Sequence, residues 1–199
     1  IQGFGNVGSN LAEILDAWGA SVVGISDVHG GIYDEKGLDI PYLLDRRDSF
    51  GSVTNLFSNR LSNADFLALP CDVLVPAALE NQITMDNVGT IQAKMIVEAA
   101  NGPTSLEASE KLHERGVLVI PDVLANAGGV TVSYFEWVQN NQGYYWTEEE
   151  VNRKLEEKMV EAVRKVLNTA KTRNITPRLA AYMIGVQKYA EASRLRGWV

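Results

Sequence analysis

The amino-acid sequence predicts an α/β fold, in which a doubly wound, mainly parallel sheet is followed by C-terminal helices. Residues 3–8 read G-F-G-N-V-G, a glycine spacing typical of a tight turn from a strand into a helix. Short apolar runs rich in β-branched residues alternate with segments of helical periodicity. Such runs are apolar on both faces, as in parallel strands covered by helices on both sides. With right-handed crossovers these elements form a Rossmann-type sheet.

Each element has its own signal. Leu11, Ile14, Leu15 and Trp18 recur at helical spacing after the glycine motif, and Gly19 suits the position after that helix. Further strands are expected in the apolar runs at 21–27, 72–75, 95–100 and 117–120, with a short excursion at 30–37 that turns at 35–37. Two short helices are expected between residues 39 and 69.

Three later helices carry start signals. The capping pairs are Thr104 with Glu107 and Thr147 with Glu150, and the third start is Thr176 followed by Pro177. Gly116 and Gly197 suit the positions after the first and the last of these helices. The helix from about residue 147 also carries an apolar stripe about one face wide.

Composition narrows the classes of function. The 199 residues are 46% hydrophobic and 22% charged, so one domain spanning 1–199 is the simplest prediction. The net charge of −7 argues against binding to nucleic acid or to an anionic membrane, and no apolar stretch approaches the roughly 20 residues that span a bilayer. Cys71 is the single cysteine, which favours the cytoplasm, and two scattered histidines predict no metal site.

The glycine motif predicts dinucleotide binding, because a helical pattern follows it and an acid, Asp27, ends the next strand. Gly3 would allow the tight turn, Gly5 would let the phosphates approach, and Gly8 would let the helix pack closely on the strand. The amides of Asn6 and Val7 would donate to the pyrophosphate. A structural turn without a ligand is the alternative. The first strand is cut to residues 1–2, so we expect this chain to be the back part of a longer polypeptide.

Asp27 would accept hydrogen bonds from the adenosine ribose, the alternative being a strand-end acid exposed to water. A carboxylate here favours NAD, while His29 could help to accommodate NADP. The candidates of this region are Gly3, Phe4, Gly5, Asn6, Val7, Gly8, Asp27 and Val28.

Three turns of small residues follow later strands, at 76–78, 100–103 and 124–129. Ligands bind at the carboxyl ends of strands in doubly wound sheets, so these turns should face one crevice that admits a nicotinamide ring. Asn and Gly also favour turns without any ligand. Asn101 and Asn126 offer both a donor and an acceptor. The candidates are Ala77, Ala78, Asn101 and Asn126.

These motifs, together with E-A-A-N-G-P-T at 98–104 and N-A-G-G-V-T-V-S-Y-F-E-W at 126–137, resemble the cofactor-binding half of glutamate dehydrogenase, from residue 1 to about 197. Leucine, phenylalanine and valine dehydrogenases share the asparagine-glycine turns, whereas V-S-Y-F-E-W resembles the glutamate branch. The resemblance implies that Ser133, helped by Val130, contacts the side-chain carboxylate of the substrate. A bond from Ser133 to a carbonyl one helical turn back is the alternative.

The resemblance also implies the reaction, NAD-dependent (NADP possible) oxidative deamination of L-glutamate to 2-oxoglutarate and ammonia. The family's catalytic lysine and aspartate precede the glycine motif, so we expect no catalytic residue in this chain, and cofactor binding without turnover. The helices from about residue 147 would pack toward the substrate domain, and a homohexamer would assemble through that domain. The alternatives are a branched-chain or aromatic amino acid dehydrogenase and a non-catalytic NAD-sensing module.

Overall fold

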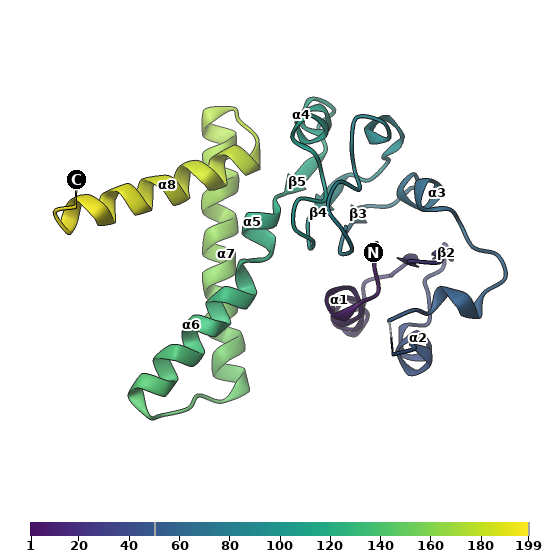
Figure 1. Ribbon diagram of the computed structural model, residues 1–199, viewed down its shortest axis with the longest axis horizontal. Helices are drawn as coiled ribbons and strands as arrows, with labels where there is room; N and C mark the ends of the chain where they lie inside the picture. The colour runs from purple at the N-terminus through teal and green to yellow at the C-terminus, as the bar shows by residue number, and fades with distance from the viewer. Residues whose placement is uncertain (50, 199) are drawn as a thin grey trace. The chain divides into compact units, whose positions relative to one another are not determined.

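The structure is a computed structural model that describes residues 1–49 and 51–198. The chain divides into two compact units, residues 1–119 and 120–199, and each is described by itself. The first unit contains the strands and short helices, and the second contains the long helices α6, α7 and α8 (Figure 1). The chain therefore has the α/β class that the sequence predicts. Its organisation as one domain stays a prediction.

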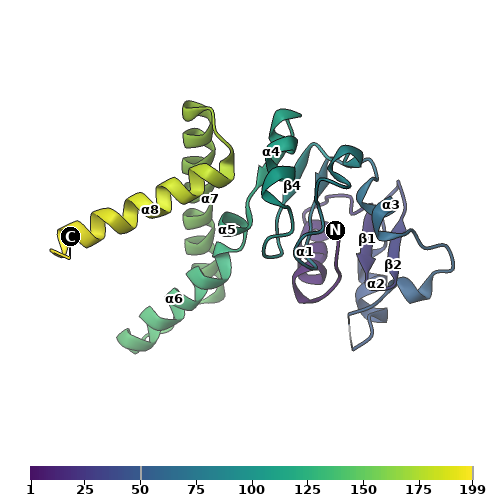
Figure 2. The same cartoon turned by 45° about the horizontal axis from the view of Figure 1, so that its top comes forward.

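The strands of the first unit form two sheets. In one, β1 (Gly24–Asp27) pairs antiparallel with β2 (Gly30–Tyr33), and the two lie side by side in Figure 2. The other has the order β3-β4-β5, with β3 (Val73–Leu74) parallel to β4 (Met95–Val97) and β5 at Leu118–Ile120. The excursion predicted at 30–37 thus begins as a strand, and the expected turn follows, with a hydrogen bond from the Gly37 amide to the Asp34 carbonyl.

Gln2 joins the two sheets. It forms parallel bridges to Ser26 on one side and to Pro76 on the other. The Gln2 amide donates to the Val75 carbonyl at 2.9 Å, and the Gly3 amide donates to the Ser26 carbonyl at 2.9 Å. Residues 1–3, here called the central rung, therefore lie between β1 and β3 in the sheet and form hydrogen bonds on both sides.

Helix α1 (Asn6–Ala17) follows this rung, so the helix predicted after the glycine motif is present. Its buried residues are the small Gly8, Ser9 and Ala12, whereas Trp18 is 81% exposed and Ile14 is 47% exposed. Leu15 is partly buried and packs against the core around Phe4. At the end of the helix, the Trp18 and Gly19 amides donate to the Ile14 and Asp16 carbonyls, respectively. Gly19 follows the helix, as predicted.

Short helices fill the rest of the first unit. The two predicted between residues 39 and 69 are α2 (Ile40–Arg46) and α3 (Asn63–Leu67), and the 3-10 helices η1 (Thr54–Leu56) and η2 (Val88–Thr90) accompany them. Their apolar side chains complete two cores, one around Phe4, Ile25 and Leu43 and one around Ile83, Ile96 and Leu112.

Helix α4 (Leu106–Glu114) begins one residue later than predicted. The Ser105 hydroxyl, rather than that of Thr104, caps it by accepting from the Ala108 amide at 3.2 Å. Thr104 is buried and forms a parallel bridge with Ile83, and this extended pairing delays the helix. Gly116, at φ +77, follows the helix as predicted.

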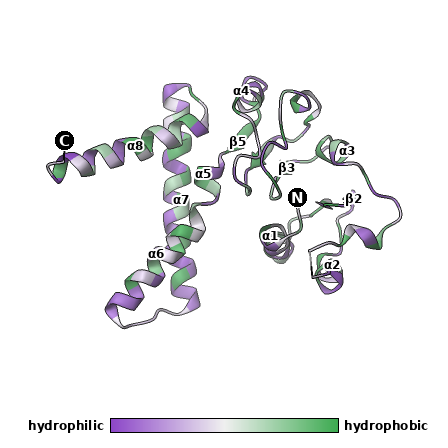
Figure 3. Ribbon diagram, viewed as in Figure 1, coloured by the Kyte–Doolittle hydropathy of each residue, from purple (hydrophilic) through white to green (hydrophobic). Residues whose placement is uncertain are grey.

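The second unit is helical. It contains α5 (Asp122–Ala125), α6 (Ala127–Gln142), α7 (Glu148–Arg173) and α8 (Pro177–Leu195). The capping box of Thr147 with Glu150 and the Thr176 cap are both present, as predicted. Apolar and polar residues are interleaved along α7 (Figure 3), and its Val166 and Ala170 join Leu124 and Ala180 in the core. No helix among the described residues is long and apolar enough to cross a membrane.

Candidate functional site

The glycine turn connects the central rung to α1. Gly3 is buried with φ +98, and a Cβ there would lie 2.9 Å from the Ala77 carbonyl oxygen. A Cβ on Gly8 would lie 1.9 Å from the Gly3 carbonyl oxygen, so only glycine lets α1 start this close to the strand. A Cβ on Gly5 would meet nothing within 4 Å, so the space above Gly5 is open. Gly3 and Gly8 thus have the backbone geometry that the motif predicts, and the approach of phosphates to Gly5 stays a prediction.

The amino-terminal end of α1 offers unused donors. Gly5 is the residue before the helix and supplies no side-chain cap, and Asn6 and Val7 are exposed. The first amides of a helix have no partner within the helix and carry its positive end. An anion such as a phosphate group is their natural partner. Phe4, in contrast, is 1% exposed, so only its backbone can face a ligand.

Two of the small-residue turns lie beside the glycine turn. The Ala77 amide donates to the Gln2 carbonyl at 2.7 Å, which holds residues 76–78 against the central rung. The Ala99 and Ala100 amides both donate to the Pro76 carbonyl at 2.9 Å, which brings the Asn101 turn next to the Ala77 turn. Asn101 and Ala78 are exposed. The first unit therefore brings together the predicted candidates at 3–8, 77–78 and 101.

Asp27 ends β1 as predicted, but its carboxylate is held by its own chain. Oδ2 accepts from the Ser52 hydroxyl and from the Val53 and Thr54 amides at 2.8–2.9 Å. Oδ1 accepts from the Thr54 hydroxyl at 2.5 Å and from the His29 amide at 2.8 Å. Burial alone would raise the pKa of Asp27, but these hydrogen bonds outweigh burial and lower the pKa to about 2. Asp27 is thus a partly exposed strand-end acid bonded to its own chain, and its contact with the ribose stays a prediction. Val28 beside it is 89% exposed.

A segment without any recognised motif completes this region. Residues 47–49 and 51–54, here called the crossing segment, run from the end of α2 to the partners of Asp27. The Arg47 guanidinium donates to the Ser9 hydroxyl on α1. Gly51 has φ +82, and a Cβ on it would lie 3.1 Å from the Phe4 carbonyl oxygen. Sequence reasoning missed this segment, although the Asp48-to-Gly51 spacing is a turn signal.

The remaining candidates belong to the second unit. Asn126 is exposed between α5 and α6, and Val130 and Ser133 are exposed on α6 at a spacing of one helical turn. Within the described residues the Ser133 hydroxyl makes no hydrogen bond, so the alternative, a bond to a carbonyl one turn back, is not formed. This leaves the hydroxyl able to bind a ligand.

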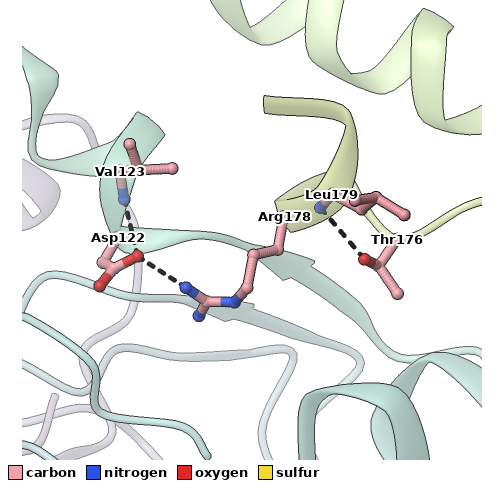
Figure 4. A network of polar contacts seen from close by, with 5 residues as sticks. All are labelled: Asp122, Val123, Thr176, Arg178 and Leu179. Atoms are coloured by element: carbon pink, nitrogen blue, oxygen red, sulfur yellow. Dashed lines mark hydrogen bonds and ion pairs between the residues drawn. The ribbon is translucent and has the colours of Figure 1, made fainter. Parts of the chain in front are cut away.

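An ion pair fixes α5, the helix before Asn126. The Arg178 guanidinium donates to Asp122 Oδ1 at 2.9 Å, and the same oxygen accepts from the Val123 amide (Figure 4). Both side chains are mostly buried, since Arg178 is 14% exposed and Asp122 is 18% exposed. Arg178 lies in the first turn of α8, which the Thr176 hydroxyl caps through the Leu179 amide. The pair therefore joins the starts of α5 and α8.

A cavity of about 570 Å³ lies elsewhere in the first unit and is lined mainly by apolar residues before and within β1 and β3, such as Val22, Val23, Cys71 and Val73. None of the candidate residues lines this cavity. The candidates of the first unit lie instead in turns at the carboxyl ends of its strands. The described residues contain no group of three metal-ligating side chains.

The first unit is thus an α/β unit with a glycine-rich turn from strand to helix at the carboxyl ends of its strands. The chain belongs to the Glutamate/Leucine/Phenylalanine/Valine dehydrogenase family, whose model matches residues 1–197, and the resemblance seen in the sequence is confirmed.

Named relatives agree with this family. The chain is 62% identical over 199 residues to the cryptic catabolic NAD-specific glutamate dehydrogenase GudB of Bacillus subtilis, covering all of this chain and 47% of the relative. It is 62% identical over 198 residues to an NAD-specific glutamate dehydrogenase of Staphylococcus aureus, covering 48% of that protein. The chain thus spans about half the length of the curated relatives it matches.

Solved structures give the same result. The glutamate dehydrogenase of Peptoniphilus asaccharolyticus matches all of this chain and 46% of its own, with a TM-score of 0.82 and 40% identity. The hetero-hexameric glutamate dehydrogenase of Thermus thermophilus matches 98% of this chain and 46% of its own, with a TM-score of 0.90 and 33% identity.

Proposed function

We propose that this chain is the dinucleotide-binding part of an NAD-dependent glutamate dehydrogenase, which converts L-glutamate to 2-oxoglutarate and ammonia. The observation that carries the proposal is the glycine turn. Gly8 permits α1 to start against the central rung, and the open space above Gly5 gives a phosphate access to uncapped amides. The names of the relatives from B. subtilis and S. aureus support glutamate as substrate and NAD as cofactor.

The proposal includes a Rossmann-type, doubly wound sheet. The bridges of Gln2 give the order β2-β1-rung-β3-β4-β5, with the antiparallel β2 at one edge. The chain runs from the central rung first to β1 and β2 and later to β3, on the other side, so the strand order reverses at the glycine turn. Dinucleotides bind at such a switch point in folds of this class.

The described residues fit a dinucleotide. The amides of Asn6 and Val7 would bind its pyrophosphate, and the small turns at Ala77, Ala78 and Asn101 would leave room for the nicotinamide ring and offer it amide groups. Asn126 of the second unit is proposed as a further cofactor-binding residue. When bound, NAD accepts the hydride from the α-carbon of the amino acid. This chain's own residues would bind and orient the two reactants; none of them is proposed as the general acid or base.

Ser133 and Val130 are proposed to contact the substrate. Their i,i+3 spacing places them on one face of α6, and both are exposed. The Ser133 hydroxyl would donate to the distal carboxylate of glutamate, a group that leucine and valine lack.

We extend the proposal to a cytoplasmic homohexamer in which the helices from about residue 147 pack against the substrate domain. The hexameric T. thermophilus enzyme supports the oligomer.

Gly5→Val tests the proposed function. A β-branched side chain at Gly5 would fill the open space above the α1 amides, and Gly5 has an ordinary φ of −70, so the backbone tolerates the change. Calorimetric titration of the protein that carries this chain should show saturable NAD binding. The variant should lose roughly a hundredfold in affinity, because charge-assisted hydrogen bonds to the pyrophosphate are lost.

Gly89→Val is the matched control. Gly89 is also exposed, with nothing within 4 Å of its Cβ position, but it lies in η2. This variant should bind NAD like the wild type. Equal NAD affinities for the wild type and both variants would refute the assignment of dinucleotide binding.

A further inference from the structure

The crossing segment contacts α1, the glycine turn and the end of β1 at three successive points. At its start, Arg47 donates to the Ser9 hydroxyl in α1. In its middle, Gly51 lies against the backbone of Phe4 and Gly5. At its end, residues 52–54 hold the Asp27 carboxylate. The segment therefore lies against the glycine turn on one side and the end of β1 on the other.

Arg47 brings a cation to an end of α1 that is already positive. Its recorded contact is with a neutral hydroxyl, and within the described residues it forms no ion pair. Its neighbour Arg46 differs in all respects, since it is exposed, pairs with Asp45 at 3.3 Å and lies over the Tyr42 ring. A half-buried guanidinium beside a helix amino terminus is unfavourable unless an anion lies between them.

We propose that Arg47 binds the pyrophosphate of the dinucleotide, together with the amides of the first turn of α1. This inference rests on the proposed function and adds a residue to it. One of the five guanidinium N–H groups is used by Ser9, and the others are free to meet phosphate oxygens. Ser9 follows Asn6 by three positions, so its hydroxyl holds the guanidinium next to the amides that would bind the same group.

The position of Arg47 selects the pyrophosphate over a 2′-phosphate on the ribose. The ribose end of the site lies at the end of β1, where the crossing segment presents residues 52–54 and the carboxylate of Asp27. Arg47 lies at the opposite end of that segment, after α2, and its guanidinium contacts Ser9 of α1. A contact with the pyrophosphate is common to NAD and NADP, whereas a contact with the 2′-phosphate would serve NADP alone.

The test compares Arg47→Gln with Arg46→Gln, which remove the same charge from adjacent positions. Affinities for NAD, ADP-ribose and adenosine would be measured by calorimetry at two salt concentrations, with the protein that carries this chain. Arg47→Gln should weaken NAD and ADP-ribose by roughly tenfold or more and reduce the salt dependence of binding, while adenosine stays unchanged. Arg46→Gln should match the wild type for all three ligands.

Two further variants separate phosphate binding from a structural role of the Arg47–Ser9 contact. Ser9→Ala removes the anchoring hydroxyl and keeps the cation, so it should retain most of the affinity. Arg47→Lys keeps the charge without the planar group, so its affinity for NAD should lie between those of the wild type and Arg47→Gln. A loss in Ser9→Ala equal to that in Arg47→Gln would overturn the proposal in favour of a structural contact.

The remaining outcomes are also decisive. Equal NAD affinity in Arg47→Gln and Arg46→Gln overturns the role of Arg47 and leaves the proposed function standing. With NADP titrated as a fourth ligand, a loss of affinity in Arg47→Gln that is confined to NADP would assign Arg47 to the 2′-phosphate and overturn the pyrophosphate contact. A wild-type protein that binds neither NAD nor ADP-ribose would instead refute the proposed function itself.

Discussion

Asp27 accepts five hydrogen bonds from the described residues of its own chain, so its carboxylate holds the crossing segment in place whether or not a ribose is bound. A carboxylate oxygen has lone pairs for two or three donors, and both oxygens of Asp27 are near that number. A ribose hydroxyl would therefore have to share or displace a donor. The preference for NAD that this acid suggests stays a prediction, and a substitution here changes the segment as well as the charge.

Asp27→Asn should reveal this structural role through pH. The pKa of Asp27 is lowered from 3.8 to about 2 in the folded protein, so ionised Asp27 stabilises the fold above about pH 4. This contribution, about 1 kcal/mol after allowance for solvent screening of a partly exposed carboxyl, disappears as the pH falls from about 4 to 2. Urea unfolding should show the wild type more stable than the variant at pH 7 and a shrinking difference below pH 4. A difference in the free energy of unfolding that stays constant down to pH 2 would contradict the structural role.

At the scale of elements, helix caps could be predicted from neighbouring residues in the sequence, whereas pairing between residues far apart in the sequence could not. Thr147 and Glu150 form their capping box because both partners lie within one helical turn. The start of α4 was missed by one residue because the pairing of Thr104 with Ile83, which lies 21 positions away, overrides its capping preference. The antiparallel β1–β2 pair was also missed, because its two-residue turn, Val28-His29, lacks the glycine signal typical of a short hairpin.

The candidate site shows the same division. The backbone geometry of Gly3 and Gly8 could be predicted, because φ and close approach depend on a few consecutive residues. The partners of Asp27 could not be predicted, because Ser52 to Thr54 follow it by more than 20 positions and carry no motif. Arg47 was missed for the same reason, since nothing in the sequence places it beside Ser9.

The Asp122–Arg178 pair should contribute to the stability of the second unit, because its side chains are mostly buried. A double-mutant cycle of Asp122→Asn and Arg178→Gln, followed by urea unfolding, should give a coupling energy of about 1–2 kcal/mol. The exposed pair of Lys111 and Glu114 is the control and should couple by less than about 0.5 kcal/mol. Equal coupling in the two cycles would show that burial adds nothing to the Asp122–Arg178 pair.

At the scale of the whole molecule, this chain supplies about half the length of its curated relatives, so the choice of substrate must be tested in the protein that carries it. Ser133→Ala should reduce the preference for glutamate over norvaline by about 1–3 kcal/mol, because the hydroxyl that would meet the distal carboxylate is removed. The readout is the ratio of kcat/KM for the two amino acids, and NAD affinity should stay unchanged.

Ser58→Ala is a suitable control for Ser133→Ala, since Ser58 is an exposed serine of the first unit, far in sequence from α6. This control should leave the ratio of kcat/KM as in the wild type. A ratio that Ser133→Ala leaves unaltered would favour a branched-chain or aromatic substrate over glutamate.

The double pairing of Gln2 also sets an order for folding. Its partners on one side are complete once residue 26 is made, whereas those on the other side include Val75, Pro76 and Ala77. During synthesis the β1–β2 hairpin can form early, but the central rung cannot be paired on both sides until about 50 further residues have emerged from the ribosome. Until then the glycine turn lies at an open sheet edge, which is the form most exposed to pairing with another nascent chain.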